Sequence, residues 1–220
     1  VCRELPAHGW RVRTDAVAGS WPRPDGPARG ELQAALAALP DGAVVLVDGL
    51  VACGVPEVVV PAARRLRLAV LVHLPLAAET GLPAADAAEL ERREREVLAA
   101  ATAVVVTGRW AAARLGEVDP GKVHLAEPGV DPAPVAPGSA DGAQLLCVAS
   151  ITRRKAQDVL VAALAWAQRP LRCTLAGPRR DPGFDAELQA LIERARPGAS
   201  VSLVGPLAGA ELEAAYAAAD

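Results

Sequence analysis

Apolar and polar positions alternate along the chain with two different periods. Short runs of β-branched residues and Leu are separated by Ala-rich stretches whose apolar residues recur every three or four positions. The runs predict strands at Trp10–Thr14, Ala43–Val47, Leu68–His73, Ala103–Thr107, Val123–Ala126, Leu145–Ala149, Leu171–Ala176 and Val201–Val204. The helical period is clearest over Ala84–Ala101, Lys155–Gln168, Phe184–Ala195 and Gly209–Ala219. Such alternation is typical of βαβ units, so we expect an α/β fold with parallel sheets.

The pattern breaks between Pro128 and Gly142. This stretch, "PGVDPAPVAPGSADG", is rich in Pro and Gly and has no periodicity, which indicates a linker or a long crossover. It predicts two Rossmann-like domains, residues 1–135 and residues 142–220. The second would hold three βα units, so we expect it to be incomplete or to depend on the first for burial.

Composition narrows the choice of partners. The 220 residues carry a net charge of −3 and have a pI near 5.7, so no overall basic field favours nucleic acid, and an anion site would have to be local. The cysteines, at positions 2, 53, 147 and 173, form no CxxC pair. Free thiols in a cytoplasmic protein are therefore favoured over disulfides or zinc.

The sequence contains no apolar run of about 20 residues, so no membrane-spanning helix is expected. It also lacks Met, and its basic residues are mostly Arg. These features favour a fragment that is truncated at both ends.

Candidate chemistry lies just after the predicted strands, because ligands of open parallel sheets bind beyond the carboxyl ends of the strands. The most unusual feature there is the basic triplet Arg153, Arg154 and Lys155, which follows Ser150 and precedes a helical pattern. A helix N-terminus already carries partial positive charge, so cations there indicate a bound anion. Two or more cations suit a diphosphate. The alternative is a solvated loop.

Other residues at strand ends are small or hydrogen-bonding. His73 follows one strand, Gly177 and Pro178 follow another, and Val204, Gly205 and Pro206 end the last. Glycine lets a ligand approach the backbone, although ordinary βα turns would have the same composition. The chain has no GxGxxG after a strand and no GxxxxGK[ST], which disfavours a nicotinamide dehydrogenase and a P-loop NTPase.

Several segments resemble glycosyltransferase family 4, the group 1 glycosyltransferases of the GT-B fold. In the second half these are "LLCVASITRRKAQDVLVAALA", "CTLAGP" and "VSLVGPLAGAELEAAYAAAD". In the first half they are "LAVLVHLPLAAETGL", "AAATAVVVTGRWAAARL" and "VHLAEPGVD". The resemblance extends over nearly the whole chain from about Ala43, with the segments in the order that the family has.

The resemblance implies a retaining, metal-independent transferase that moves a sugar such as a hexose from a nucleotide-diphosphate donor to an acceptor. By position it implies that Lys155 pairs with the donor diphosphate, with Arg154 or Arg153 beside it. It implies that His73 lies on the acceptor side of an interdomain cleft as a catalytic residue. Gly177, Pro178, Val204, Gly205 and Pro206 would border the nucleotide. No cofactor is expected besides the nucleotide-sugar substrate, and the acceptor would be a sugar, a lipid or a small molecule, with peripheral membrane contact in the lipid case.

The sequence departs from the family pattern at several places. Ser150 occupies the position of an arginine that many members carry, and Ala156 replaces the glycine after the lysine. The E-x7-E segment and the N-terminal Gly-rich loop are missing, so the fragment itself is expected to lack parts of the donor site. Two alternatives remain open: a non-catalytic nucleotide-sugar-binding protein, or a sugar-nucleotide epimerase of GT-B fold.

Overall fold

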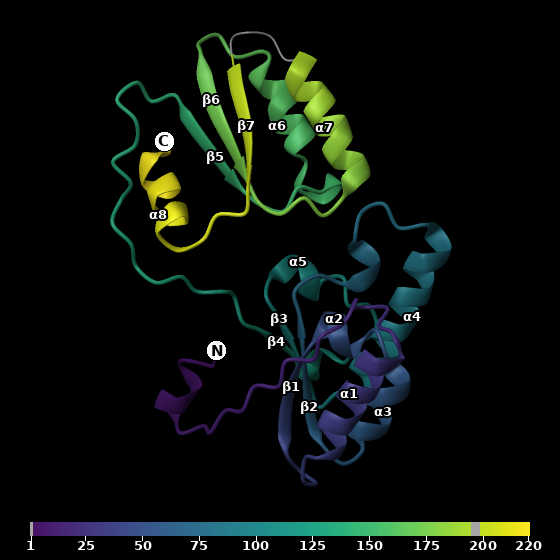
Figure 1. Ribbon diagram of the computed structural model, residues 1–220. Coiled ribbons are helices and arrows are strands. Elements are labelled where there is room, and N and C mark those ends of the chain that lie inside the picture. Colours follow the sequence, from purple (N-terminus) through teal and green to yellow (C-terminus); the bar gives the residue numbers. More distant parts are fainter. Residues whose placement is uncertain (1, 195–198) are drawn as a thin grey trace. The chain divides into compact units, whose positions relative to one another are not determined.

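The computed structural model in Figure 1 describes residues 2–194 and 199–220. The chain divides into two compact units, Val1–Gly129 and Val130–Asp220, which we call unit 1 and unit 2. Each unit contains one parallel sheet with helices packed against it. The α/β fold class with two Rossmann-like parts is therefore confirmed.

Unit 1 is built on strands that follow one another across the sheet in chain order, β1-β2-β3-β4, and all pair in parallel. The strands are β1 (Val44–Asp48), β2 (Arg67–Val72), β3 (Ala103–Val106) and β4 (Val123–Leu125). The α-helices are α1 (Gly26–Ala37), α2 (Gly49–Ala52), α3 (Pro56–Ala63), α4 (Ala84–Ala100) and α5 (Arg109–Ala112). Short 3-10 turns lie at Leu5–His8, Leu76–Ala78 and Pro120–Lys122.

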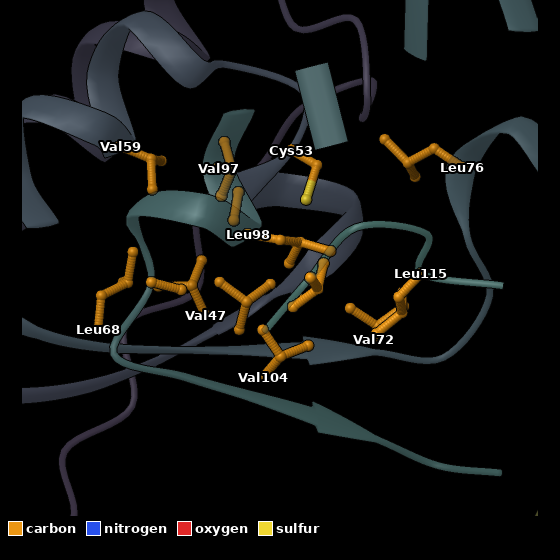
Figure 2. Close-up of a cluster of buried hydrophobic side chains, with 14 of the residues drawn as sticks. Val47, Cys53, Val59, Leu68, Val72, Leu76, Val97, Leu98, Val104 and Leu115 are labelled. Carbon is orange, nitrogen blue, oxygen red and sulfur yellow. The ribbon is translucent and has the colours of Figure 1, made fainter. Parts of the chain in front are cut away.

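The core of unit 1 lies between this sheet and the helices α1, α3 and α4 (Figure 1). Alternate strand residues such as Leu68, Val72 and Val104 point into it, and Val59 and Val97 meet them from the helices (Figure 2). Their exposed fractions are 1% or less. Because side chains alternate across a strand, this packing fixes which face of each strand is covered.

Unit 2 has β6 between β5 and β7 in a parallel sheet, with α6 and α7 on one face and α8 beside β5 (Figure 1). The strands are β5 (Gln144–Val148), β6 (Leu171–Ala176) and β7 (Ala199–Gly205), and the α-helices are α6 (Gln157–Leu164), α7 (Pro182–Arg194) and α8 (Gly209–Ala218). A 3-10 turn covers Arg153–Lys155. Phe184, Leu175 and Leu188 are buried at the centre of its core.

One predicted strand is wrong. Residues Trp10–Thr14 form neither helix nor strand, and all five side chains are exposed, Trp10 by 52%. An alternating segment is stable as a strand only when it has a ladder partner and an apolar surface to cover. The sheet of unit 1 pairs β1 to β2 and does not extend to this segment.

Two predicted helices also have different boundaries in the structure. The helix expected at Lys155–Gln168 begins at Gln157 and ends at Leu164, because the basic triplet forms a separate 3-10 turn before it. The helix expected at Phe184–Ala195 starts earlier, at Pro182, where Asp181 Oδ1 accepts a hydrogen bond from Phe184 N at 3.0 Å. Its expected last residue, Ala195, lies outside the described residues.

Glu94 is a buried acid on the face of α4 that packs against the core. Its side chain is 6% exposed, and Oε1 accepts a hydrogen bond of 3.1 Å from the backbone N of Leu76, in the segment that follows His73. Burial raises the pKa of Glu94 from 4.5 to about 7, since the charged form loses its hydration. The acid thus positions this segment at the cost of burying a carboxylate above pH 7.

We expect Glu94→Gln to remove a pH-dependent loss of stability. The pKa of Glu94 is higher in the folded than in the unfolded chain, so its protonation stabilises the fold below about pH 4.5, and this contribution is lost as pH rises to about 7. The loss is of order 3 kcal/mol. Gln keeps the acceptor for Leu76 N. In urea unfolding, the unfolding free energy of the variant relative to wild type should therefore be higher at pH 8 than at pH 5. An equal difference at both pH values would contradict this.

Candidate functional site

The loops after β5 and β6 lie side by side at the carboxyl edge of the unit 2 sheet. Beyond the end of β5, Ile151 N donates to Pro178 O at 2.9 Å, and Ile151 forms an isolated parallel bridge with Arg179. Gln157, buried at the start of α6, donates from Nε2 to Ser150 O at 2.9 Å. The predicted site residues Ser150 and Pro178 are therefore held on neighbouring loops.

Gly177 and Gly205 join the third strand to the same edge. Gly177 N donates to Gly205 O at 2.7 Å, and a Cβ added at Gly177 would lie 1.9 Å from Ala149 O. No larger residue fits there without moving the backbone. Val204, which is 46% exposed, and Pro206 flank Gly205, so the predicted nucleotide-side residues occur together along this edge.

The cations of the triplet differ in their surroundings. The guanidinium of Arg153 lies 2.5 Å from Glu187 Oε1 on α7 and 5.5 Å from the centre of the Phe184 ring. The hydrogen bond to Glu187 raises the pKa of Arg153 above its ordinary value. Arg154 also interacts with another part of the chain. Lys155 is exposed, and none of the salt bridges between described residues involves it.

The turn that presents Lys155 ends in an unusual backbone conformation. Ala156 has φ 53° and ψ 40°, in the left-handed region, and is the non-glycine residue with positive φ within the described chain. A Cβ in this region costs about 1–2 kcal/mol. A glycine, which the resemblance to family 4 leads us to expect after the lysine, would adopt this conformation freely.

In unit 1 the structure brings His73 close to Asp48, which ends the neighbouring strand. His73 Nε2 lies 3.8 Å from Asp48 Oδ2, and the side chains are 59% and 49% exposed. Asp48 Oδ1 also accepts from Leu50 N at 2.8 Å and so caps α2. The resemblance did not single out Asp48, although its place directly after an apolar run was a signal. The expected position of His73 across a cleft from the unit 2 loops stays a prediction.

Sequence reasoning also missed two cations after β6. Arg179 and Arg180 follow Gly177 and Pro178, and Arg179 Nε lies 3.1 Å from Asp185 Oδ1 on α7. The signal was a second basic pair just beyond a strand. In residues 2–194 and 199–220, no three His, Cys, Asp or Glu side chains are grouped so as to hold a metal ion. No helix in the same residues has the length and apolar character needed to cross a membrane.

Comparison with family models and with curated proteins finds no match. Solved structures do match. The protein is similar to TarM (TM-score 0.63, 10% identity, 86% of this chain and 38% of that one). It is also similar to HepE from Anabaena in complex with UDP-glucose (TM-score 0.61, 16% identity, 83% and 52%). A third similar structure is sucrose-phosphate synthase from Thermosynechococcus elongatus (TM-score 0.65, 22% identity, 86% of this chain and 52% of that one).

These likenesses show the fold, and they agree with the GT-B class expected from the sequence. The chain spans about half the length of these structures or less. At identities of 22% or below they do not assign the chain to family 4.

We expect Ala156→Gly to stabilise unit 2. Glycine removes the left-handed strain, and part of that gain is offset by its greater freedom in the unfolded chain, so the net rise in unfolding free energy should be up to about 1 kcal/mol. Urea unfolding measures it. Ala162→Gly, in the exposed interior of α6, is the matched control and should lose about 1 kcal/mol. Equal destabilisation by both variants would contradict the expectation.

Proposed function

We propose that the protein is a glycosyltransferase that moves a sugar from a nucleotide-diphosphate donor to an acceptor with retention of configuration and without a metal ion. The observation that carries the proposal is the carboxyl edge of the unit 2 sheet, where Lys155 is exposed in the loop after β5 and the neighbouring loops are joined by the hydrogen bonds Ile151 N to Pro178 O and Gly177 N to Gly205 O. Similarity to glycosyltransferase structures, one of which holds UDP-glucose, supports the same chemistry.

The chemistry follows from charge. When the glycosidic bond to the donor breaks, the shared electron pair stays on the diphosphate oxygen, which gains negative charge. An ammonium group already in place stabilises that charge more in the transition state than in the ground state. Lys155 is suited to this role because, within the described chain, no salt bridge occupies it.

The two glycines of unit 2 and His73 of unit 1 each have a proposed role of their own. Gly177 and Gly205 have no side chains to keep a nucleotide from the backbone at this edge. His73, which lies beside Asp48 in unit 1, would hydrogen-bond the donor sugar or the acceptor. On the retaining route, the leaving phosphate oxygen takes the proton of the acceptor hydroxyl on the same face of the sugar. The acceptor would be a sugar, a lipid or another small molecule.

Donor binding by Lys155 gives the decisive test. We expect Lys155→Ala to weaken binding of the preferred donor among UDP-, ADP- and GDP-glucose by about 10- to 100-fold, the worth of one charge-assisted hydrogen bond. Its unfolding free energy should stay within about 0.5 kcal/mol, because the side chain is exposed. Isothermal titration and thermal unfolding measure the two quantities.

Lys122→Ala is the matched control. Lys122 lies in unit 1, where its Nζ donates to Ala99 O at 3.0 Å, so its loss should leave donor binding unchanged. Unchanged binding in Lys155→Ala would remove this site from consideration. Donor binding without sugar transfer to any acceptor would instead favour a nucleotide-sugar-binding protein.

A further inference from the structure

The loops at the carboxyl edge of the unit 2 sheet carry two groups of neighbouring cations. The first is the triplet Arg153, Arg154 and Lys155 in the loop after β5, and the second is the pair Arg179 and Arg180 in the loop after β6. The hydrogen bond from Ile151 N to Pro178 O places the loops in contact, and the bridge between Ile151 and Arg179 continues this pairing. Cations from both loops are thus available at one edge.

Helix α7 neutralises one cation of each loop. Its Glu187 carboxylate binds Arg153 at 2.5 Å, and its Asp185 carboxylate binds Arg179 at 3.1 Å. Asp185 is the more buried of the two acids, with 14% of its side chain exposed against 60% for Glu187. It also accepts a hydrogen bond of 2.8 Å from Gln189 Nε2. Both arginines are therefore part of the packing of α7.

Arg180 is placed differently. Arg179 forms the bridge with Ile151 and the ion pair with Asp185, whereas Arg180, the next residue, takes part in neither contact. Asp181, the next residue, is turned toward α7, whose Phe184 N it binds at 3.0 Å. Arg180 is exposed, and no salt bridge among residues 2–194 and 199–220 includes it.

We propose that Arg180 is the second cation of the diphosphate site, acting with Lys155 from the neighbouring loop. This inference rests on the proposed function. A diphosphate has two phosphoryl groups and more than one negative charge, so a single ammonium leaves part of that charge without a partner. Arg180 supplies a planar guanidinium, which can donate two parallel hydrogen bonds to one phosphoryl group. Lys155 supplies a point charge to the other phosphoryl group.

Arg153 is less suited than Arg180 to bind the diphosphate, because it already has a partner. A side chain in a salt bridge must break that contact before it can bind a ligand, which reduces the net gain in affinity. The bond from Arg153 to Glu187 and the stacking of Arg153 on Phe184 would both be lost. Arg180 has no such bond to break among the contacts of the described chain.

The test compares nucleoside diphosphates with the matching monophosphates. We expect Arg180→Gln to weaken binding of the preferred ligand among UDP, ADP and GDP by about tenfold or more, and to change the affinity for the corresponding monophosphate much less. The ratio of the two affinities should therefore fall. Arg180→Lys, which keeps the charge, should recover part of the loss. A purely structural role would lower both affinities together.

The matched control is Arg169→Gln, which has the same change in charge. Arg169 precedes β6 at the opposite edge of the sheet, where Nη1 donates to Asp141 O at 3.1 Å, and it should keep the wild-type ratio. If Lys155→Ala lowers the ratio and Arg180→Gln does not, Arg180 has no part in the site and only this inference fails. If the wild-type protein binds none of the three diphosphates, the proposed function fails, and this inference fails with it.

Discussion

The close approach of the β5 and β6 backbones at their carboxyl ends is the constraint on which the candidate site depends. It is possible because position 177 has no side chain: a Cβ there would lie 1.9 Å from Ala149 O and 3.1 Å from Ser150 N. Just beyond this contact, Ile151 N donates to Pro178 O at 2.9 Å. The register of the two strands therefore decides which residues of the two loops face each other.

Helix α7 then determines which of the cations remain available. It packs on α6 around Phe184 and Leu188, and its acids bind an arginine from each loop. Ion pairs at exposed sites contribute little to stability, so the contacts made by Glu187 matter more for where they hold Arg153 than for their energy. The packing of a helix thus separates structural cations from those able to bind a ligand.

The sequence predicted where strands and site residues lie better than it predicted which side chains pair with one another. Strands such as Ala103–Val106 were predicted because central parallel strands are continuous apolar runs. The site residues at strand ends followed from the same topology. The pair of Arg153 and Glu187, 34 positions apart, has no local signal. The left-handed Ala156 also could not be predicted, because alanine is the strongest helix former and the pattern continued through it.

The conformation of Ala156 shows what the loop requires in order to present Lys155. Ala156 joins the 3-10 turn to α6, and the next residue, Gln157, is buried and donates from Nε2 to Ser150 O. The cost is local: a strained alanine and the buried Gln157 Oε1, which has no hydrogen-bond partner among the described residues. The cost is tolerated because Ile151 and Val161, buried on either side of the turn, anchor it in the core. A turn fixed in this way loses little entropy when a ligand binds, so an anion that meets Lys155 finds the backbone already ordered.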